Sequence, residues 1–113
     1  VKTVQPVWPP NNGFIGKPES TTLEVGSTFE RIGKEVNGLF ASPIGTPFVQ
    51  KSLPPSYADL PMHVYKVIKP IDNVLVGKIA PWFGMEGGGI QYSFGNVGDI
   101  RFLKLNEYIK MIK

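Results

Sequence analysis

Ala80–Tyr92 reads Ala-Pro-Trp-Phe-Gly-Met-Glu-Gly-Gly-Gly-Ile-Gln-Tyr and contains the strongest local signal in the chain. The three glycines at 87–89 have no Cβ and permit positive φ, so the backbone here either turns sharply or lies directly against a ligand. The residues after them alternate as in a strand, which places Gln91 and the following tyrosine on opposite faces. Two interpretations remain open. The stretch is either a rigid aromatic rim around the Gln91 amide, or a tight hairpin whose Trp82 and Phe83 pack into the core.

The composition indicates one small domain that is rich in turns. With 113 residues, of which 42% are hydrophobic, the chain suffices for a single modest core. Thirteen glycines and eleven prolines make up about a fifth of the chain, so short strands and shaped loops are expected instead of long helices. We therefore expect residues 1–113 to form one domain, and the abrupt start at Val1 suggests a piece of a larger protein.

Charge and residue usage exclude several classes of protein. The net charge of +3 comes from scattered lysines without a clustered basic face, so no nucleic-acid-binding surface is expected. The absence of cysteine excludes disulfides, thiolate–metal sites and a cysteine nucleophile. No apolar run approaches the roughly 20 residues that span a membrane. Since the single histidine has no suitably spaced carboxylates beside it, no metal site is expected.

The order of strand, loop and helix patterns predicts an α+β fold. Short strands are predicted at 21–25, 28–32, 62–68, 73–79, 90–94 and 108–112. Four prolines between residues 39 and 55 exclude a long helix or a central strand, so that segment is expected to be a shaped loop. A helix is predicted at 97–105, with Asn96 as N-cap and Asp99 in its first turn. The prediction is thus α+β with short, mostly antiparallel strands.

Few residues suit acid–base or nucleophilic chemistry. His63 is the only histidine, and its predicted strand places it on the face opposite Met62 and Val64. Arg31, one of two arginines, suits either a bidentate phosphate contact or a surface ion pair. The glycine triplet is neither a P-loop nor a dinucleotide fingerprint, because no Gly-Lys-Ser/Thr and no helix follow it. What remains is a candidate set of Arg31, His63 and Gln91 for a reaction that needs little acid–base help.

A series of short motifs, taken together and in order, resembles one known family. The motifs are Trp8-Pro-Pro-Asn-Asn-Gly-Phe14, Arg31-Ile-Gly33, Ser42-Pro-Ile-Gly-Thr-Pro-Phe48, Leu53-Pro-Pro55, His63-Val-Tyr-Lys-Val67, Lys69-Pro70, Ala80-Pro-Trp-Phe-Gly84 and Gly87-Gly-Gly-Ile-Gln-Tyr92. Over nearly the whole chain they are similar to the tuberculosis necrotizing toxin (TNT) domain family, which are NAD(P)+ glycohydrolases. The resemblance implies an ADP-ribosyltransferase-like fold: a small, strongly bent, mostly antiparallel sheet with short helices and a dinucleotide cleft.

The resemblance also implies an activity and a biological setting. Members hydrolyse the nicotinamide–ribose bond, so nicotinamide and ADP-ribose, or its phosphate, are the expected products. The domain would be the C-terminal toxic module of a secreted or delivered effector that depletes NAD(P)+ in the target-cell cytosol. A cognate immunity protein would protect the producer. NAD+ or NADP+ is expected as the substrate, with no cofactor or metal, and with activity as a monomer.

By the same resemblance, Gln91, His63 and Arg31 take catalytic roles. The implied substrate contacts are Phe14, Phe40, Lys51, Trp82, Gly88, Gly89 and Tyr92. Arg31 and Lys51 would hold the pyrophosphate, and the aromatic rings would cover the nicotinamide or the adenine. Some members have a tyrosine where this chain has Phe40, which keeps the ring without the hydroxyl.

Two other functions remain open at this level. One is an ADP-ribosyltransferase on the same fold, with Glu86 as the only acid near the glycines. The other is a non-catalytic module that binds a dinucleotide or a partner protein in a cleft at Trp82. Nicotinamide leaves NAD+ as a neutral group and needs no general acid, so the scarcity of acid–base residues fits hydrolysis.

Overall fold

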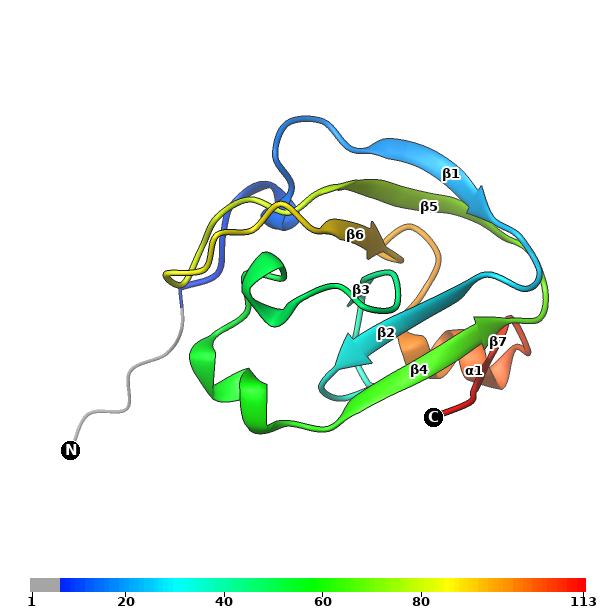
Figure 1. Cartoon of the computed structure of the whole chain (residues 1–113). Helices are drawn as coiled ribbons and strands as arrows, with labels where there is room; N and C mark the ends of the chain where they lie inside the picture. The colour runs from blue at the N-terminus through cyan, green and yellow to red at the C-terminus, as the bar shows by residue number, and fades with distance from the viewer. Residues whose placement is uncertain (1–6) are drawn as a thin grey trace.

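The computed structural model describes residues 7–113, which form two antiparallel sheets and one short α-helix (Figure 1). The first sheet has the order β1 (Glu19–Leu23), β5 (Ile71–Lys78), β6 (Ile90–Ser93) and β3 (Phe40–Ala41). The second has the order β2 (Thr28–Ile32), β4 (Met62–Val67) and β7 (Ile109–Met111). Between β6 and β7 the chain forms α1 (Ile100–Leu105). The β1–β2 and β4–β5 connections join the sheets at one end, and loops gather at the other.

Aromatic and aliphatic residues from both sheets and from α1 build the core. Phe29 is fully buried, lies stacked on Tyr65 with ring centroids 5.4 Å apart, and meets Phe94 at 5.2 Å. The remaining members are Leu23, Ala41, Val67, Ile71, Val74, Ile100, Leu103 and Ile109. This shared core fixes the two sheets against each other.

A short backbone bridge connects the two sheets into one bent surface. Glu30 on β2 and Ser42, just after β3, exchange both backbone hydrogen bonds, with N···O distances of 2.7 and 3.0 Å. The small, bent antiparallel arrangement predicted from the sequence is therefore confirmed. Of the helices in residues 7–113, none has the length and apolar character needed to cross a bilayer.

The helix begins later than predicted, whereas the proline-rich segment contains no long helix and no central strand, as expected. The helix begins at Ile100 instead of at 97, because Asp99 is the N-cap and its Oδ1 accepts from Phe102 N at 2.8 Å. Residues 97 and 98 instead donate their N–H groups to Phe94 O in a turn after β6. The segment 39–55 contains β3 and the 3₁₀ helix η2 (Phe48–Gln50), and η3 (Pro55–Asp59) follows it.

Candidate active site

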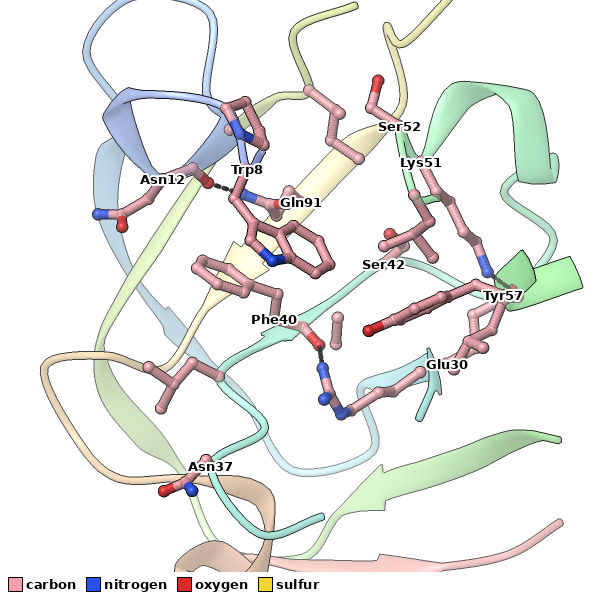
Figure 2. Close-up of a pocket in the computed structure, with 18 residues that line it drawn as sticks. Trp8, Asn12, Glu30, Asn37, Phe40, Ser42, Lys51, Ser52, Tyr57 and Gln91 are labelled. Atoms are coloured by element: carbon pink, nitrogen blue, oxygen red, sulfur yellow. Dashed lines mark hydrogen bonds and ion pairs between the residues drawn. The ribbon is translucent and has the colours of Figure 1, made fainter. Parts of the chain in front are cut away.

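A cleft of about 420 Å³ lies between the ends of the two sheets and the N-terminal segment (Figure 2). Segments far apart in sequence line it. They are Trp8, Pro9, Asn12 and Gly13; Glu30, Arg31 and Ile32; Asn37 and Leu39 to Ser42; Lys51 to Leu53; Tyr57; Ile79; and Gln91. Of the residues predicted from the sequence, the cleft brings together Gln91, Arg31, Phe40 and Lys51.

Gln91 lies on β6 with its side chain directed into the cleft. It pairs across the sheet with Gly77, and only 9% of its surface is exposed. Its Nε2 donates to Asn12 O at 2.9 Å (Figure 2). No hydrogen bond to its Oε1 is found within residues 7–113. The amide is therefore held in place by one bond and retains groups for a ligand.

The turn that holds Gln91 has an unusual backbone. In η1 (Asn11–Gly13), three consecutive residues have positive φ, at 56°, 53° and 83°. Such conformations cost on the order of 1–3 kcal/mol for a non-glycine residue and persist where the surroundings impose them. The Asn11 side chain supplies part of that restraint by donating to Phe14 O and Gly16 O at 3.0 and 2.6 Å. The turn thereby presents the Asn12 carbonyl to the Gln91 amide.

Arg31 contributes a positive charge that no carboxylate pairs with in the described part of the chain. Its Nη1 donates to Phe40 O at 2.7 Å, and Nε and Nη2 donate to Lys34 O at 3.1 and 3.0 Å. Burial lowers the pKa of the guanidinium from its ordinary value. Three of its five N–H groups are thus occupied by carbonyls, and two are left to bind an anion in the cleft.

Lys51 lines the same cleft, but its charge is already neutralised. Its Nζ lies 2.5 Å from Glu30 Oε2, and the two residues are only 8% and 3% exposed. The other Glu30 oxygen accepts from Gly45 N. A lysine held in this way fixes the 45–51 loop to β2, which differs from the pyrophosphate contact expected from the sequence.

His63 does not line the cleft. It is half-buried and lies across from Arg31 in the β2–β4 pair. Beside it is the Glu35 carboxylate, which accepts from Tyr65 Oη at 2.8 Å and from Lys104 Nζ at 2.9 Å. Burial raises the pKa of Glu35, but the hydrogen bonds from Lys104 and Tyr65, together with the Lys104 and His63 charges, outweigh it and lower the pKa overall. The histidine therefore lies next to the polar cluster of Glu35, Tyr65 and Lys104 and not in the cleft.

Five further residues predicted to contact substrate also lie outside the cleft lining. Phe14 is 4% exposed and packs over Gly77, where a Cβ would come 2.9 Å from its ring. Tyr92 lies on the face of β6 opposite Gln91, and burial raises the pKa of its phenol. The remaining three are Trp82, Gly88 and Gly89.

The glycine triplet packs against the protein's own backbone. Gly87, Gly88 and Gly89 donate to Val49 O, Ile79 O and Gln50 O at 3.0, 2.8 and 3.2 Å. A Cβ at position 89 would come 2.9 Å from the carbonyl oxygen of residue 50. The close approach that these glycines permit is thus to the backbone of η2 and of residues 79–80.

The loop before the triplet is a tight turn, as one of the two interpretations predicted. Met85 N donates to Trp82 O at 2.8 Å, and Phe83 and Gly84 both have positive φ, at 53° and 73°, as in a type I′ turn. The two aromatic residues are half-buried and lie outside the core cluster. The Trp82 Nε1 donates instead to Val7 O at 2.6 Å, which places the loop against the N-terminal segment.

Several cleft residues were missed in the sequence, among them Trp8, Asn12 and Tyr57. The sequence does show a turn signal around Asn12, and a proline pair lies close to Trp8 and another close to Tyr57. Their meeting point depends on tertiary structure alone.

No group of three His, Cys, Asp or Glu side chains suited to a metal is found in residues 7–113. Chemically, the cleft combines one positioned amide, one guanidinium with two N–H groups left for a ligand, and exposed aromatic rings, which suits a ligand with phosphates and planar rings.

Comparison with known proteins identifies the family. The family model described as tuberculosis necrotizing toxin matches residues 22–112. The conidial surface nicotinamide adenine dinucleotide glycohydrolase nadA of Aspergillus fumigatus is 35% identical over 127 aligned positions, covering 95% of this chain but 53% of that protein. The structure of tuberculosis necrotizing toxin complexed with its immunity factor IFT superposes with a TM-score of 0.75 at 24% identity, over 91% of this chain and 60% of that one. The chain thus spans little more than half the length of these relatives. It belongs to the tuberculosis necrotizing toxin family.

Proposed function

We propose that this domain is an NAD(P)+ glycohydrolase, which splits the nicotinamide–ribose bond with water. The observation that carries the proposal is the cleft in which the Gln91 amide and the Arg31 guanidinium line one space of about 420 Å³. A relative that aligns with 95% of this chain is named as a nicotinamide adenine dinucleotide glycohydrolase. Family membership and cleft chemistry therefore favour the same reaction.

In the proposed reaction, the bond between C1′ and the nicotinamide nitrogen breaks and its electron pair goes to the ring. The ring leaves as neutral nicotinamide, so no general acid is needed. Water adds to C1′ and loses a proton, giving ADP-ribose. The transition state has oxocarbenium character, and the free amide groups of Gln91 would bind the ribose hydroxyls and orient the water.

Arg31 would bind the pyrophosphate through its two free N–H groups. Its fixed geometry, set by the carbonyls of Phe40 and Lys34, means that little order is lost when the anion binds. Lys51 is assigned a structural role here because Glu30 already pairs with it. NAD(P)+ is the substrate, and no step is assigned to a cofactor.

We further propose that the domain is a toxin, delivered as a secreted effector into the target-cell cytosol. A cognate immunity protein would then protect the producing cell. Support comes from the family name and from the related toxin, whose structure was solved with its immunity factor. Coexpression of this domain with a neighbouring gene product would test the proposed immunity protein. A true immunity protein should abolish the loss of NAD+.

The activity is tested by mixing purified protein with NAD+ and following free nicotinamide and ADP-ribose. We expect both products in equal amounts without a protein acceptor, and with or without EDTA. Glu86 is exposed and outside the cleft lining, so Glu86→Gln should retain the activity. Nicotinamide release that requires a protein acceptor and is lost in Glu86→Gln would favour a transferase, and no release at all would overturn the proposal.

A further inference from the structure

Three aromatic side chains from separate segments meet around Trp8, and two of them, Trp8 and Tyr57, line the cleft. Trp8 comes from the N-terminal segment, Tyr57 from η3 and Phe83 from the loop before the glycines. The ring centroid of Trp8 is 6.0 Å from that of Tyr57 and 5.3 Å from that of Phe83, at interplanar angles of 73° and 86°. Both contacts are therefore edge-on, and no aromatic ring in residues 7–113 lies parallel to the indole.

The indole is exposed although its backbone is held firmly. Trp8 is 51% exposed and lines the cleft. On one side of it, Trp82 Nε1 donates to Val7 O, and on the other Gln91 Nε2 donates to Asn12 O. Two prolines follow directly and restrict the chain further. A large apolar ring held still with half its surface exposed suits the binding of a ligand better than core packing.

Tyr57 supplies a second cleft-lining ring beside the indole. Figure 2 shows the Tyr57 side chain extending in among the residues that line the cleft, with its phenol oxygen towards the middle of that group. It is half-buried and lines the cleft together with Trp8. A flat ligand ring that enters here meets an indole and a phenol at once.

We propose that Trp8 and Tyr57 form a subsite that binds a planar heteroaromatic ring of the dinucleotide, either the adenine or the nicotinamide. The identity of the ligand rests on the proposed function. Stacking on an aromatic side chain needs only the π-face of the ring, and its loss typically weakens binding about 5- to 100-fold.

Calorimetric titration of ADP-ribose and of nicotinamide tests the subsite, since neither compound is consumed. In Trp8→Ala and Tyr57→Ala we expect the Kd of one of the two compounds to rise about 5- to 100-fold. Trp8→Phe, which keeps a ring, should recover part of that loss. The matched control is Phe102→Leu, because Phe102 is a 41% exposed aromatic residue that lies outside the cleft lining.

The titrations of ADP-ribose and of nicotinamide show which ring of the dinucleotide the subsite binds. Weaker ADP-ribose binding with unchanged nicotinamide binding assigns the subsite to adenine, and the reverse assigns it to nicotinamide. Unchanged Kd values for both compounds in Trp8→Ala and Tyr57→Ala would overturn the proposal. The titration needs no turnover, so a protein that binds ADP-ribose through Trp8 but releases no nicotinamide from NAD+ would contradict only the glycohydrolase assignment.

Discussion

At the scale of single residues, the position of Arg31 depends on a glycine. A Cβ at Gly38 would come 2.6 Å from both Arg31 Nε and Lys34 O, which is closer than real contacts allow. The guanidinium can therefore keep its bonds to the carbonyls of Lys34 and Phe40 only while residue 38 has no side chain.

Gly38→Ala should displace the Arg31 guanidinium and weaken NAD+ binding. Because hydrogen bonds to a charged group are worth about 1.5–3 kcal/mol, we expect kcat/KM for NAD+ to fall on the order of 10- to 100-fold, mostly through KM. Gly95→Ala is the matched control, since its Cβ would meet only Ser93 Oγ at 3.5 Å. Equal kinetic constants in both variants and the wild type would show that Arg31 does not hold the substrate.

The sequence predicted some cleft residues and misplaced others for physical reasons. Gln91 and Arg31 reach the cleft as their motifs indicated, although their catalytic roles remain predictions. Lys51 also reaches the cleft, but it looked unpaired in the sequence because its partner Glu30 lies 21 positions away, and only the fold brings the two together. Phe14 looked like a free aromatic wall, yet the absence of a side chain at Gly77 lets its ring pack inside.

At the scale of elements, α1 fixes the loop that carries the Arg31 contacts. Asp99 caps the helix through Oδ1 and accepts from Asn37 N through Oδ2, both at 2.8 Å. Ile100 N also donates to Gly38 O. Hydrogen bonds from the backbone of residues 102 and 37 lower the pKa of the Asp99 carboxyl below its ordinary 3.8. One carboxylate thus joins the helix end to the wall of the cleft.

Asp99→Asn should destabilise the fold in a pH-dependent way. A carboxyl whose folded pKa is lowered adds stability above its unfolded pKa of about 4, and this stability is lost as pH falls through the folded value. We expect a lower urea midpoint than the wild type at pH 7, and a difference that shrinks as the pH falls below about 4. A difference that stays constant between pH 7 and pH 3 would contradict the charge argument.

Elements with a clear apolar alternation were predictable, and those defined by loops were not. The strand at 28–32 is found as β2, and that at 62–68 is found as β4 with its last residue removed. The two-residue strand β3 is too short for any periodicity, and it pairs because β6 offers it an edge. The helix start was misjudged because Asn96 and Asp99 are both good caps, and tertiary contacts with the 35–38 loop favour the second.

At the scale of the whole molecule, one aromatic cluster holds the sheets together. Phe29 is 0% exposed and contacts Tyr65 from its own sheet and Phe94 from the end of β6. Since the cleft lies between the ends of both sheets, its geometry depends on this packing. The bent shape was predictable from the family resemblance, whereas the order of the strands was not, because it follows from long-range pairing.

Phe29→Ala should cost about 3–5 kcal/mol of unfolding free energy, through lost burial and the cavity left behind. That is a large part of the roughly 5–15 kcal/mol that stabilises a small domain. Phe102→Ala removes an equal ring that is 41% exposed on α1 and should cost about 1 kcal/mol or less. Urea unfolding of both variants measures the difference, and similar losses would argue against a core centred on Phe29.

The most direct test of the account compares kcat for NAD+ hydrolysis in the wild type, Gln91→Ala and Gln50→Ala. Gln50 is a second glutamine, lies on η2 and does not line the cleft, so it controls for loss of an amide. With folding checked by urea unfolding, we predict that Gln91→Ala loses on the order of 10²–10³ in kcat, as removal of one positioned transition-state hydrogen bond does, and that Gln50→Ala stays near the wild type. A Gln91→Ala enzyme that turns over NAD+ within about twofold of the wild-type kcat, far short of the predicted loss, would contradict the catalytic role of this cleft.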